Sequence, residues 1–597
     1  SPKSIARLGR AGEGNVTPAR SVGFRGSPIG GSALLQPRAG RMLWITAAWG
    51  SCFLFIVWGL RDAPALWFAA LRALTAGAVL VAVSFVHRDS RAGDPDLHTH
   101  VAIANKAQTL EGRWHTLDSR MIYKARQSAS ETYDAFLRAH LTANLGVRWV
   151  ARPTGPGKRP VWEIDGIDPA LCRAWSSRRS DIDEVSADLA ARFRTEHGRP
   201  PTSVEMIHLA QQATLFTRQA KHEPRTLAEQ RAAWRAQADT RLGPGGVDRM
   251  LHAALHPVSS QPVELGAEWY DRNAARVVTT LEAGRATWQA WHVRAEALRQ
   301  LAGLPIPPEQ LDTVVDRLTG TALKQHSWQL DPAGDGITEP DVLRRRDGHS
   351  VYEVAGSTTF SSSRVLAAEH SLLATAARDD GRRVDPVLVT VALLESAANG
   401  TTLNPGQAQL VHDLASSGRR LQLAIAPAGT GKTTALAVLA NAWTGSGGTV
   451  IGLAPSAAAA EVLAEHLEGA PCDTLAKLAH ALEHPDTAPD WARTISPDTL
   501  LIVDEAGMAD TPTLARITQH VTSLGGSVRL VGDTHQLTAI AAGGILTDLA
   551  ATHGATRLEE VLRFSDPAEA AARLALREGN RAALAFYPDT RRLHPAQ

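Results

Sequence analysis

The chain has 597 residues and a formal net charge of +1, from 62 basic and 61 acidic side chains. This length exceeds what one hydrophobic core needs and predicts three or four domains. The balanced charge excludes a protein that is basic overall, so any DNA-binding face must be local. The three cysteines lie far apart in no metal-type spacing, which excludes a disulfide scaffold and favours a cytoplasmic location.

The beginning of the chain differs in composition from the rest. Residues 1–41 are basic and rich in glycine, serine and proline, and they predict a disordered segment. Residues 42–60 carry no charge and are long enough to cross a bilayer as a helix, while residues 63–86 are apolar except for Arg72. Two interpretations stay open for this apolar pair, a membrane-anchoring hairpin and a buried helical hairpin of a soluble domain.

The middle of the chain is soluble in character. Residues 101–150 mix short strands with a helix, and residues 181–300 place apolar side chains at helical spacing. Five tryptophans lie between residues 175 and 291. We interpret them as core residues of amphipathic helices, and the less favoured alternative is that they stack on DNA bases.

Residues 398–597 predict an α/β domain. Short apolar runs alternate there with helical segments, a pattern typical of a parallel sheet covered on both faces. The predicted strands are 421–426, 449–454, 500–503 and 528–531.

The first of these strands leads into a predicted phosphate-binding loop. The run APAGTGKT at 426–433 follows the strand and opens a helix, which is the context that a P-loop requires. Its glycines turn backbone N–H groups toward phosphates, its lysine reaches the β- and γ-phosphates, and its threonine binds Mg²⁺. The residues expected to hold ATP are Gly429, Gly431, Lys432 and Thr433. Ala426 replaces the first consensus glycine and predicts an altered nucleotide affinity.

Two further segments complete the predicted ATP site. Asp504 and Glu505 follow the strand at 500–503, which we expect to neighbour the P-loop strand. Asp504 would bind the metal and Glu505 would activate the attacking water. Gln536 follows the strand at 528–531 and would sense the γ-phosphate, or else belongs to a polar turn.

A histidine cluster forms a second candidate site. If residues 98–100 are extended, His98 and His100 project from the same face of a strand. His87 on an adjacent strand would complete three imidazoles around a divalent metal, which polarises a phosphate. Spacing alone leaves open that these histidines form no site.

The sequences of the predicted ATP-binding region and of the histidine region both resemble known families. The motor segments, in this order, resemble the first motor domain of superfamily 1 helicases, whose members place an adenine-contacting glutamine where Gln407 lies. Arg563 would neutralise transition-state charge, or is a surface arginine. The segment HRDSRAGDPDLHTHVAIANKAQTLEGRWHTLD at 87–118, with the motor downstream, resembles MobF-type conjugative relaxase–helicases of the TrwC/TraI type over residues 85–597.

This resemblance implies a domain order and a fold. The fold is a RecA-like parallel sheet, an α+β remnant of a relaxase palm and a helical region between them. The implied segments are a partial relaxase domain at 85–180, a helical linker at 181–330, a region leading into the motor at 331–397 and the first helicase domain at 398–597.

The resemblance also implies chemistry and partners. Members nick one DNA strand by tyrosine transesterification and unwind DNA for plasmid transfer, with single-stranded DNA at a transfer origin and the conjugation machinery as partners. The implied cofactors are ATP, Mg²⁺ and a divalent metal, Mg²⁺ or Mn²⁺, whose ligands are His87, His98 and His100.

Two departures from the family suggest a partial protein. No tyrosine precedes His87 in this sequence, and we expect the second motor domain to be missing. Tyr123 and Tyr133 are interpreted as packing residues. Residues 42–84 instead resemble the start of an EamA drug/metabolite transporter. We therefore expect a chain truncated at both ends that has lost nicking and unwinding, with a membrane-tethered, non-enzymatic, nucleotide-responsive DNA-binding protein as the alternative.

Overall fold

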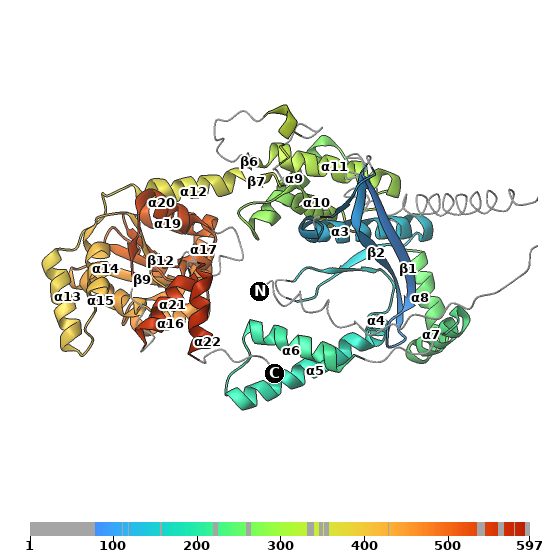
Figure 1. Ribbon diagram of the computed structural model, residues 1–597, viewed down its shortest axis with the longest axis horizontal. Coiled ribbons are helices and arrows are strands. Elements are labelled where there is room, and N and C mark those ends of the chain that lie inside the picture. Colours follow the sequence, from blue (N-terminus) through green and yellow to red (C-terminus); the bar gives the residue numbers. More distant parts are fainter. Residues whose placement is uncertain are drawn as a thin grey trace, which may run out of the picture. The chain divides into compact units, whose positions relative to one another are not determined.

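The computed structural model of the chain describes most residues from 78 onward (Figure 1). The expectations for residues 1–77 lie outside the described part, and so do those for Gln536 and Arg563. The described ranges are 78–109, 112–117, 119–155, 158–218, 225–257, 264–330, 340–344, 350–351, 357–427, 429–533, 544–558, 566–577 and 579–590.

A three-stranded antiparallel sheet begins the described chain. Its strand order is β1-β2-β3, and the long hairpin of β1 and β2 is drawn in dark blue in Figure 1. A long helix and a small antiparallel hairpin of β4 and β5 follow. The elements are β1 (Ala78–Asp89), β2 (Pro95–Thr109), β3 (Trp114–Thr116), α3 (Ser119–Leu145), β4 (Trp149–Arg152) and β5 (Val161–Ile164).

The helical interpretation of the apolar stretch 63–86 is wrong for residues 78–86, because these belong to β1. An unbroken apolar run has no helix-specific periodicity, and AVLVAVSFV is rich in β-branched valine, which favours a strand. Of the helices in the described ranges, none is both long and apolar enough to cross a bilayer.

Helices dominate the middle region, as the sequence predicts. Helices α3, α9, α10 and α11 enclose one apolar core, whereas α5 buries none of its side chains and packs along α6. The elements are α4 (Pro169–Ala174), α5 (Ser177–His197), α6 (Ser203–Phe216), α7 (Leu227–Leu242), α8 (Gly246–Leu255), α9 (Ala267–Glu282), α10 (Ala290–Gln300), α11 (Pro308–Gln325), β6 (Trp328–Leu330), η1 (Asp341–Leu343) and β7 (Thr359–Ser361).

The five tryptophans of this region have different environments. Trp288 is completely buried, which confirms a core role for that residue. The other four are only partly buried. Trp175 donates its indole N–H to the Gln237 side chain at 3.0 Å. The uniform aromatic core expected from the sequence is therefore correct only in part.

A six-stranded parallel sheet forms the motor domain and confirms the predicted α/β fold. Its strand order is β10-β9-β11-β12-β8-β13. Each of the four predicted strands is present to within one residue at either end. The strands are β8 (Leu421–Ile425), β9 (Thr449–Ala454), β10 (Cys472–Thr474), β11 (Thr499–Val503), β12 (Ser527–Gly532) and β13 (Thr556–Arg557).

Helices cover both faces of this sheet. One face packs against α12, α17, α19 and α20, and the other packs against α13, α14, α15 and α16. Their bounds are α12 (Ser363–Ala376), α13 (Pro386–Ala398), α14 (Pro405–Ser416), α15 (Lys432–Gly445), α16 (Ala457–His466), α17 (Leu475–Glu483), α19 (Thr511–Ser523) and α20 (Ile545–His553). The smaller elements are η2 (Pro485–Thr487), α18 (Asp490–Arg493), η3 (Ala506–Met508), α21 (Pro567–Arg577), η4 (Arg581–Ala585) and α22 (Phe586–Asp589).

Successive residues of the central strands point into opposite cores. Leu501 and Val503 face one apolar cluster, whereas Leu500 and Ile502 face the other. All four are at most 1% exposed, and burial of such a side chain contributes roughly 1.5–3 kcal/mol. This two-sided burial explains why the strands read as continuous apolar runs.

One cation lies inside the sheet. Arg529 on β12 is completely buried, and its Nε donates to the Leu414 carbonyl at 2.8 Å. Its Nη1 donates to the Arg419 carbonyl at 2.8 Å, and burial lowers the pKa of Arg529 to about 9. Leu414 lies in the last turn of α14, where unpaired carbonyls and the negative end of the helix dipole favour a cation.

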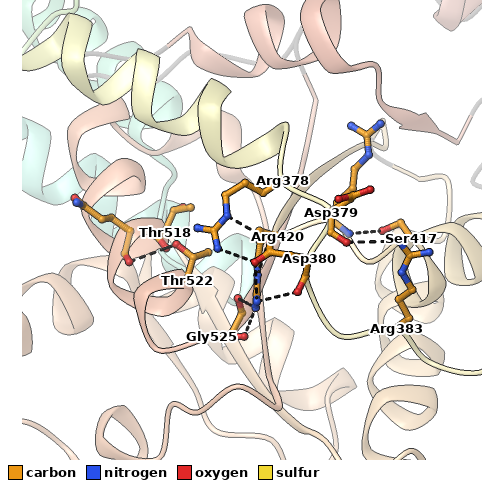
Figure 2. A network of polar contacts seen from close by, with 12 residues as sticks. Arg378, Asp379, Asp380, Arg383, Ser417, Arg420, Thr518, Thr522 and Gly525 are labelled. Atoms are coloured by element: carbon orange, nitrogen blue, oxygen red, sulfur yellow. Dashed lines mark hydrogen bonds and ion pairs between the residues drawn. The ribbon is translucent and has the colours of Figure 1, made fainter.

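A polar network holds the segment after α12 against the start of the sheet (Figure 2). Arg378 donates to the Asp380 carboxylate at 3.0 Å, and Arg420 donates to the same carboxylate at 3.2 Å. Arg420 also donates to the Gly525 carbonyl, just before β12. The hydrogen bonds from Arg378 and then Arg420 hold the pKa of Asp380 well below its usual range. The network lies at the amino ends of β8 and β12, so the carboxyl ends of these strands stay clear of it.

Candidate nucleotide and metal sites

The predicted P-loop lies between β8 and α15. Gly429 and Gly431 both adopt positive φ, at +89° and +71°, a region that a side chain makes costly. Gly431 is the N-cap of α15, which begins at Lys432, so the helix N-terminus points its N–H groups at the loop. Thr433 lies in the first turn and is half-buried.

Lys432 contacts both acidic residues of the predicted ATP site. Its Nζ lies 2.8 Å from Asp504 Oδ1 and also pairs with Glu505 Oε1. Burial by itself lowers the pKa of Lys432, but the two carboxylates outweigh burial and raise the pKa above its ordinary value. Nucleotide phosphates would replace the carboxylates as partners of Lys432, and Mg²⁺ would replace Lys432 as partner of Asp504. The geometry therefore predicts that tight nucleotide binding requires Mg²⁺.

Glu505 has an unusual backbone. Its φ is +51°, which makes it the only residue other than glycine with positive φ among those described. Its N–H donates to the Asp504 carboxylate at 2.8 Å, and Asp504 in turn donates its N–H to the Leu453 carbonyl at 2.9 Å. A left-handed conformation costs about 1–2 kcal/mol and concentrates at functional positions. It turns the Glu505 side chain toward Lys432.

The expectation that β11 neighbours the P-loop strand is wrong. β12 lies between β8 and β11, because strand order depends on which edges pair and not on order in the chain. The carboxyl end of β12 therefore lies between the P-loop and Asp504. Asp533, which follows that strand, is only 7% exposed, and sequence reasoning did not single it out.

Gln407 lies beneath the P-loop and is only 4% exposed. Its Nε2 donates to the carbonyls of Thr430 and Gly431, both at 3.1 Å. Its Oε1 accepts the N–H of Asn404 at 2.9 Å, which completes a capping box at the start of α14. The amide thus supports the loop backbone directly, and the predicted contact with adenine would have to replace one of these bonds.

Ala426 causes no backbone strain. Its φ is not positive, and the residue is 1% exposed with its methyl group in the apolar core between the sheet and α15. Its N–H donates to the Gly532 carbonyl at 2.9 Å. The departure from the consensus glycine therefore gives no structural reason for altered nucleotide affinity.

We expect Ala426→Gly to destabilise the motor domain by about 1 kcal/mol, because it removes a buried methyl group and frees the unfolded backbone. Nucleotide affinity should stay within about twofold of the parent value, because the methyl group packs in the apolar core. A tenfold change would need about 1.4 kcal/mol. Thermal unfolding and titration with a fluorescent ATP analogue measure the two effects. A variant that binds nucleotide much more tightly would show that alanine restricts the loop.

The three predicted metal ligands lie together on the hairpin of β1 and β2. His87 is directly opposite His98 in the register, and His98 and His100 share one strand face. Their ring nitrogens lie within 4.8 Å of one another, and the Nε2 atoms of His98 and His100 are 3.2 Å apart. Two nitrogens bound tetrahedrally at about 2.0–2.1 Å lie about 3.3 Å apart, so this pair already has the spacing of metal ligands.

The hairpin that carries these histidines is held by other elements. The Nδ1 atom of His98 lies 2.8 Å from the Asp96 carbonyl, which leaves Nε2 to face a metal. Asp89, two residues after His87, accepts from Gln230 of α7 at 2.6 Å. Trp234 of α7 donates its indole N–H to the Gly93 carbonyl in the turn at 2.8 Å. Sequence reasoning missed these supports, because no local pattern links residues that are about 140 positions apart.

The two tyrosines nearest the histidines in sequence do not pack as predicted. Tyr123 and Tyr133 both lie on α3, and they are 62% and 48% exposed. Arg126 lies over the Tyr123 ring at 4.2 Å from its centroid. A long helix with one buried face leaves the remaining positions to solvent, and both tyrosines occupy such positions.

Two family matches identify the class of protein that these sites define. Residues 72–241 match the TrwC relaxase family, and residues 402–597 match the AAA domain family. A relaxase domain followed by a P-loop motor domain defines a conjugative relaxase–helicase. Together with the conjugation relatives, these two matches support the resemblance to MobF-type relaxase–helicases.

Curated relatives agree with this class. The chain is 28% identical over 345 residues to the multifunctional conjugation protein TraI of Escherichia coli, which covers 51% of this chain and 18% of that protein. It is 31% identical over 161 residues to the probable conjugal transfer protein TraA of Sinorhizobium fredii (strain NBRC 101917 / NGR234), covering 27% of this chain and 14% of TraA. The chain thus spans less than a fifth of either relative.

Among solved structures, the chain is similar to a metal-bound structure of the conjugative relaxase TrwC in complex with oriT DNA, at 29% sequence identity. The match covers 27% of this chain and 50% of that chain, with a TM-score of 0.22. These comparisons do not support the transporter resemblance of residues 42–84, and the relaxase match begins within that segment, at residue 72.

Proposed function

We propose that this chain belongs to a protein that processes single-stranded DNA at a transfer origin and couples this to ATP·Mg²⁺ in its motor domain. In this proposal, His87, His98 and His100 hold a divalent metal against one DNA phosphate. The observation that supports it most directly is the convergence of the three imidazoles on one hairpin. When bound, the metal would polarise the phosphate and stabilise the charge that develops on it.

The donor atoms favour a transition metal at the histidines. Imidazole nitrogens suit first-row transition metals such as Zn²⁺, and more weakly Mn²⁺, better than they suit Mg²⁺, which prefers oxygen ligands and keeps its waters. We therefore propose Mn²⁺ or a similar ion for this site and Mg²⁺ for the carboxylate Asp504. The alternative of a membrane-tethered, non-enzymatic protein has no supporting observation in the described residues.

The histidine proposal predicts metal-dependent DNA binding. The test variant carries His87→Gln, His98→Gln and His100→Gln. In the absence of nucleotide, it should bind one equivalent of Mn²⁺ fewer than the parent chain, as measured by electron paramagnetic resonance. The gain in affinity for a single-stranded oligonucleotide on adding Mn²⁺ should fall by about tenfold or more, because the phosphate loses its metal contact.

A matched control tests whether the effect belongs to these histidines. His252 and His256 form a pair of similar ring spacing at the end of α8, with centroids 4.6 Å apart. His252→Gln with His256→Gln should leave Mn²⁺ and DNA binding unchanged. If Mn²⁺ does not alter DNA affinity in the unsubstituted chain, the proposed metal–phosphate contact is wrong.

A further inference from the structure

A second group of potential metal ligands lies on the motor domain, at the end of α17. It consists of His480, Glu483 and His484, and one ligand atom of each lies within 4.8 Å of the others. The two imidazole rings have centroids 4.4 Å apart. All three residues are exposed, so an ion from solution reaches them directly. In the described parts of the chain, only this group and the relaxase histidines bring three such side chains together.

The backbone fixes the two histidines relative to each other. They are four residues apart, the spacing that places side chains on the same side of a helix. His484 is the C-cap of α17, and its N–H donates to the His480 carbonyl at 2.9 Å. This hydrogen bond fixes the backbone of the last helical turn, from which both imidazole rings project. The negative end of the helix dipole at this terminus also favours a cation.

Glu483 is oriented by a neighbouring helix. Arg516 of α19 pairs with its Oε1 atom, which leaves the second carboxylate oxygen unengaged by that ion pair. Such outer partners orient metal ligands and are a regular feature of metal sites. Helix α19 follows the Asp504–Glu505 segment in the chain, so this ion pair ties the group to the ATP-binding half of the sheet.

We propose that His480, Glu483 and His484 bind a divalent transition metal of the Zn²⁺ class, with water as the fourth ligand. Two imidazoles and one carboxylate form a ligand set that Zn²⁺ accepts in tetrahedral sites. The bound ion joins the end of α17 to the turn that follows it and, through Arg516, to α19. Metal binding at this group therefore stabilises the motor domain, independently of the relaxase histidines.

The test uses the full chain with His87, His98 and His100 already replaced by glutamine, so that these three histidines do not contribute to metal binding. Titration with Zn²⁺, followed by calorimetry and by the thermal midpoint, should reveal one bound ion and a stabilised transition. Adding His480→Gln and His484→Gln should weaken Zn²⁺ binding by more than about tenfold and abolish the thermal shift. Mg²⁺ should not compete, because it prefers oxygen ligands.

Two further variants distinguish a specific three-ligand site from adventitious metal binding by surface histidines. Glu483→Gln should also weaken Zn²⁺ binding, because the third ligand loses its charge. His252→Gln with His256→Gln should have no effect, since that pair has no carboxylate grouped with it. Zn²⁺ binding that persists without His480 and His484, or that falls equally in the His252 and His256 control, would overturn the proposal.

Discussion

Replacing Lys432 by alanine should lower the affinity for ATP·Mg²⁺ by about a hundredfold or more, because the loop loses the cation that faces the phosphates. The same change leaves Asp504 and Glu505 without the ammonium that now contacts both. We expect the free energy of unfolding to fall by about 2 kcal/mol, the usual cost of removing a largely buried charged partner. Titration with a fluorescent ATP analogue and thermal unfolding measure the two effects.

The stability effect depends on pH in a defined direction. The folded pKa of Lys432 lies above its ordinary value, so the stabilisation is fully present below about pH 10.4 and disappears as the pH rises through the folded pKa. Across neutral pH the difference between variant and parent should therefore stay constant. Lys477→Ala is the matched control, because Lys477 is exposed and pairs with Asp473 at the surface. Equal ATP affinity in parent and Lys432→Ala would contradict the P-loop assignment.

Replacing Glu505 by glutamine should slow ATP hydrolysis by about 10²- to 10⁴-fold, because the amide cannot accept a proton from the attacking water. Binding should be retained or strengthened, since Lys432 loses one of the two carboxylates that compete with phosphate. A single-turnover assay with protein in excess over ATP measures hydrolysis even when steady-state turnover is slow.

Control variants isolate the role of this carboxylate. Glu465→Gln on α16 changes an exposed glutamate in the same domain and should leave hydrolysis unchanged. Glu505→Asn should be as inactive as the glutamine variant but more stable, because asparagine tolerates positive φ better. Hydrolysis by Glu505→Gln at the parental rate would mean that another group activates the water.

Local patterns in the sequence were sufficient for much of the motor domain. The strand, loop and helix around Lys432 are consecutive in the chain, and their chemistry depends on residues within one turn of each other. The strands of the sheet were predicted closely because residues buried on both faces produce continuous apolar runs. The grouping of His98 with His100 was also predictable, because side chains two apart on a strand share a face.

Long-range pairing decided the features that the sequence left open or misjudged. The apolar run before His87 has no periodicity that separates a helix from a strand. Its valines favour a strand, and pairing with β2 makes residues 78–86 one. Register then sets His87 opposite His98, and it depends on the turn and on contacts with α7.

The sequence by itself indicated the chemistry that we propose for the chain, from a predicted phosphate-binding loop, an acidic pair and three imidazoles at strand spacing. Only the tertiary structure decided the geometry in which these groups meet. It inserted β12 between the P-loop and Asp504, and it engaged Gln407 with the loop backbone. The physical reason is that hydrogen-bond partners across a sheet or between helices are chosen by packing of the whole domain, which no local window of residues contains.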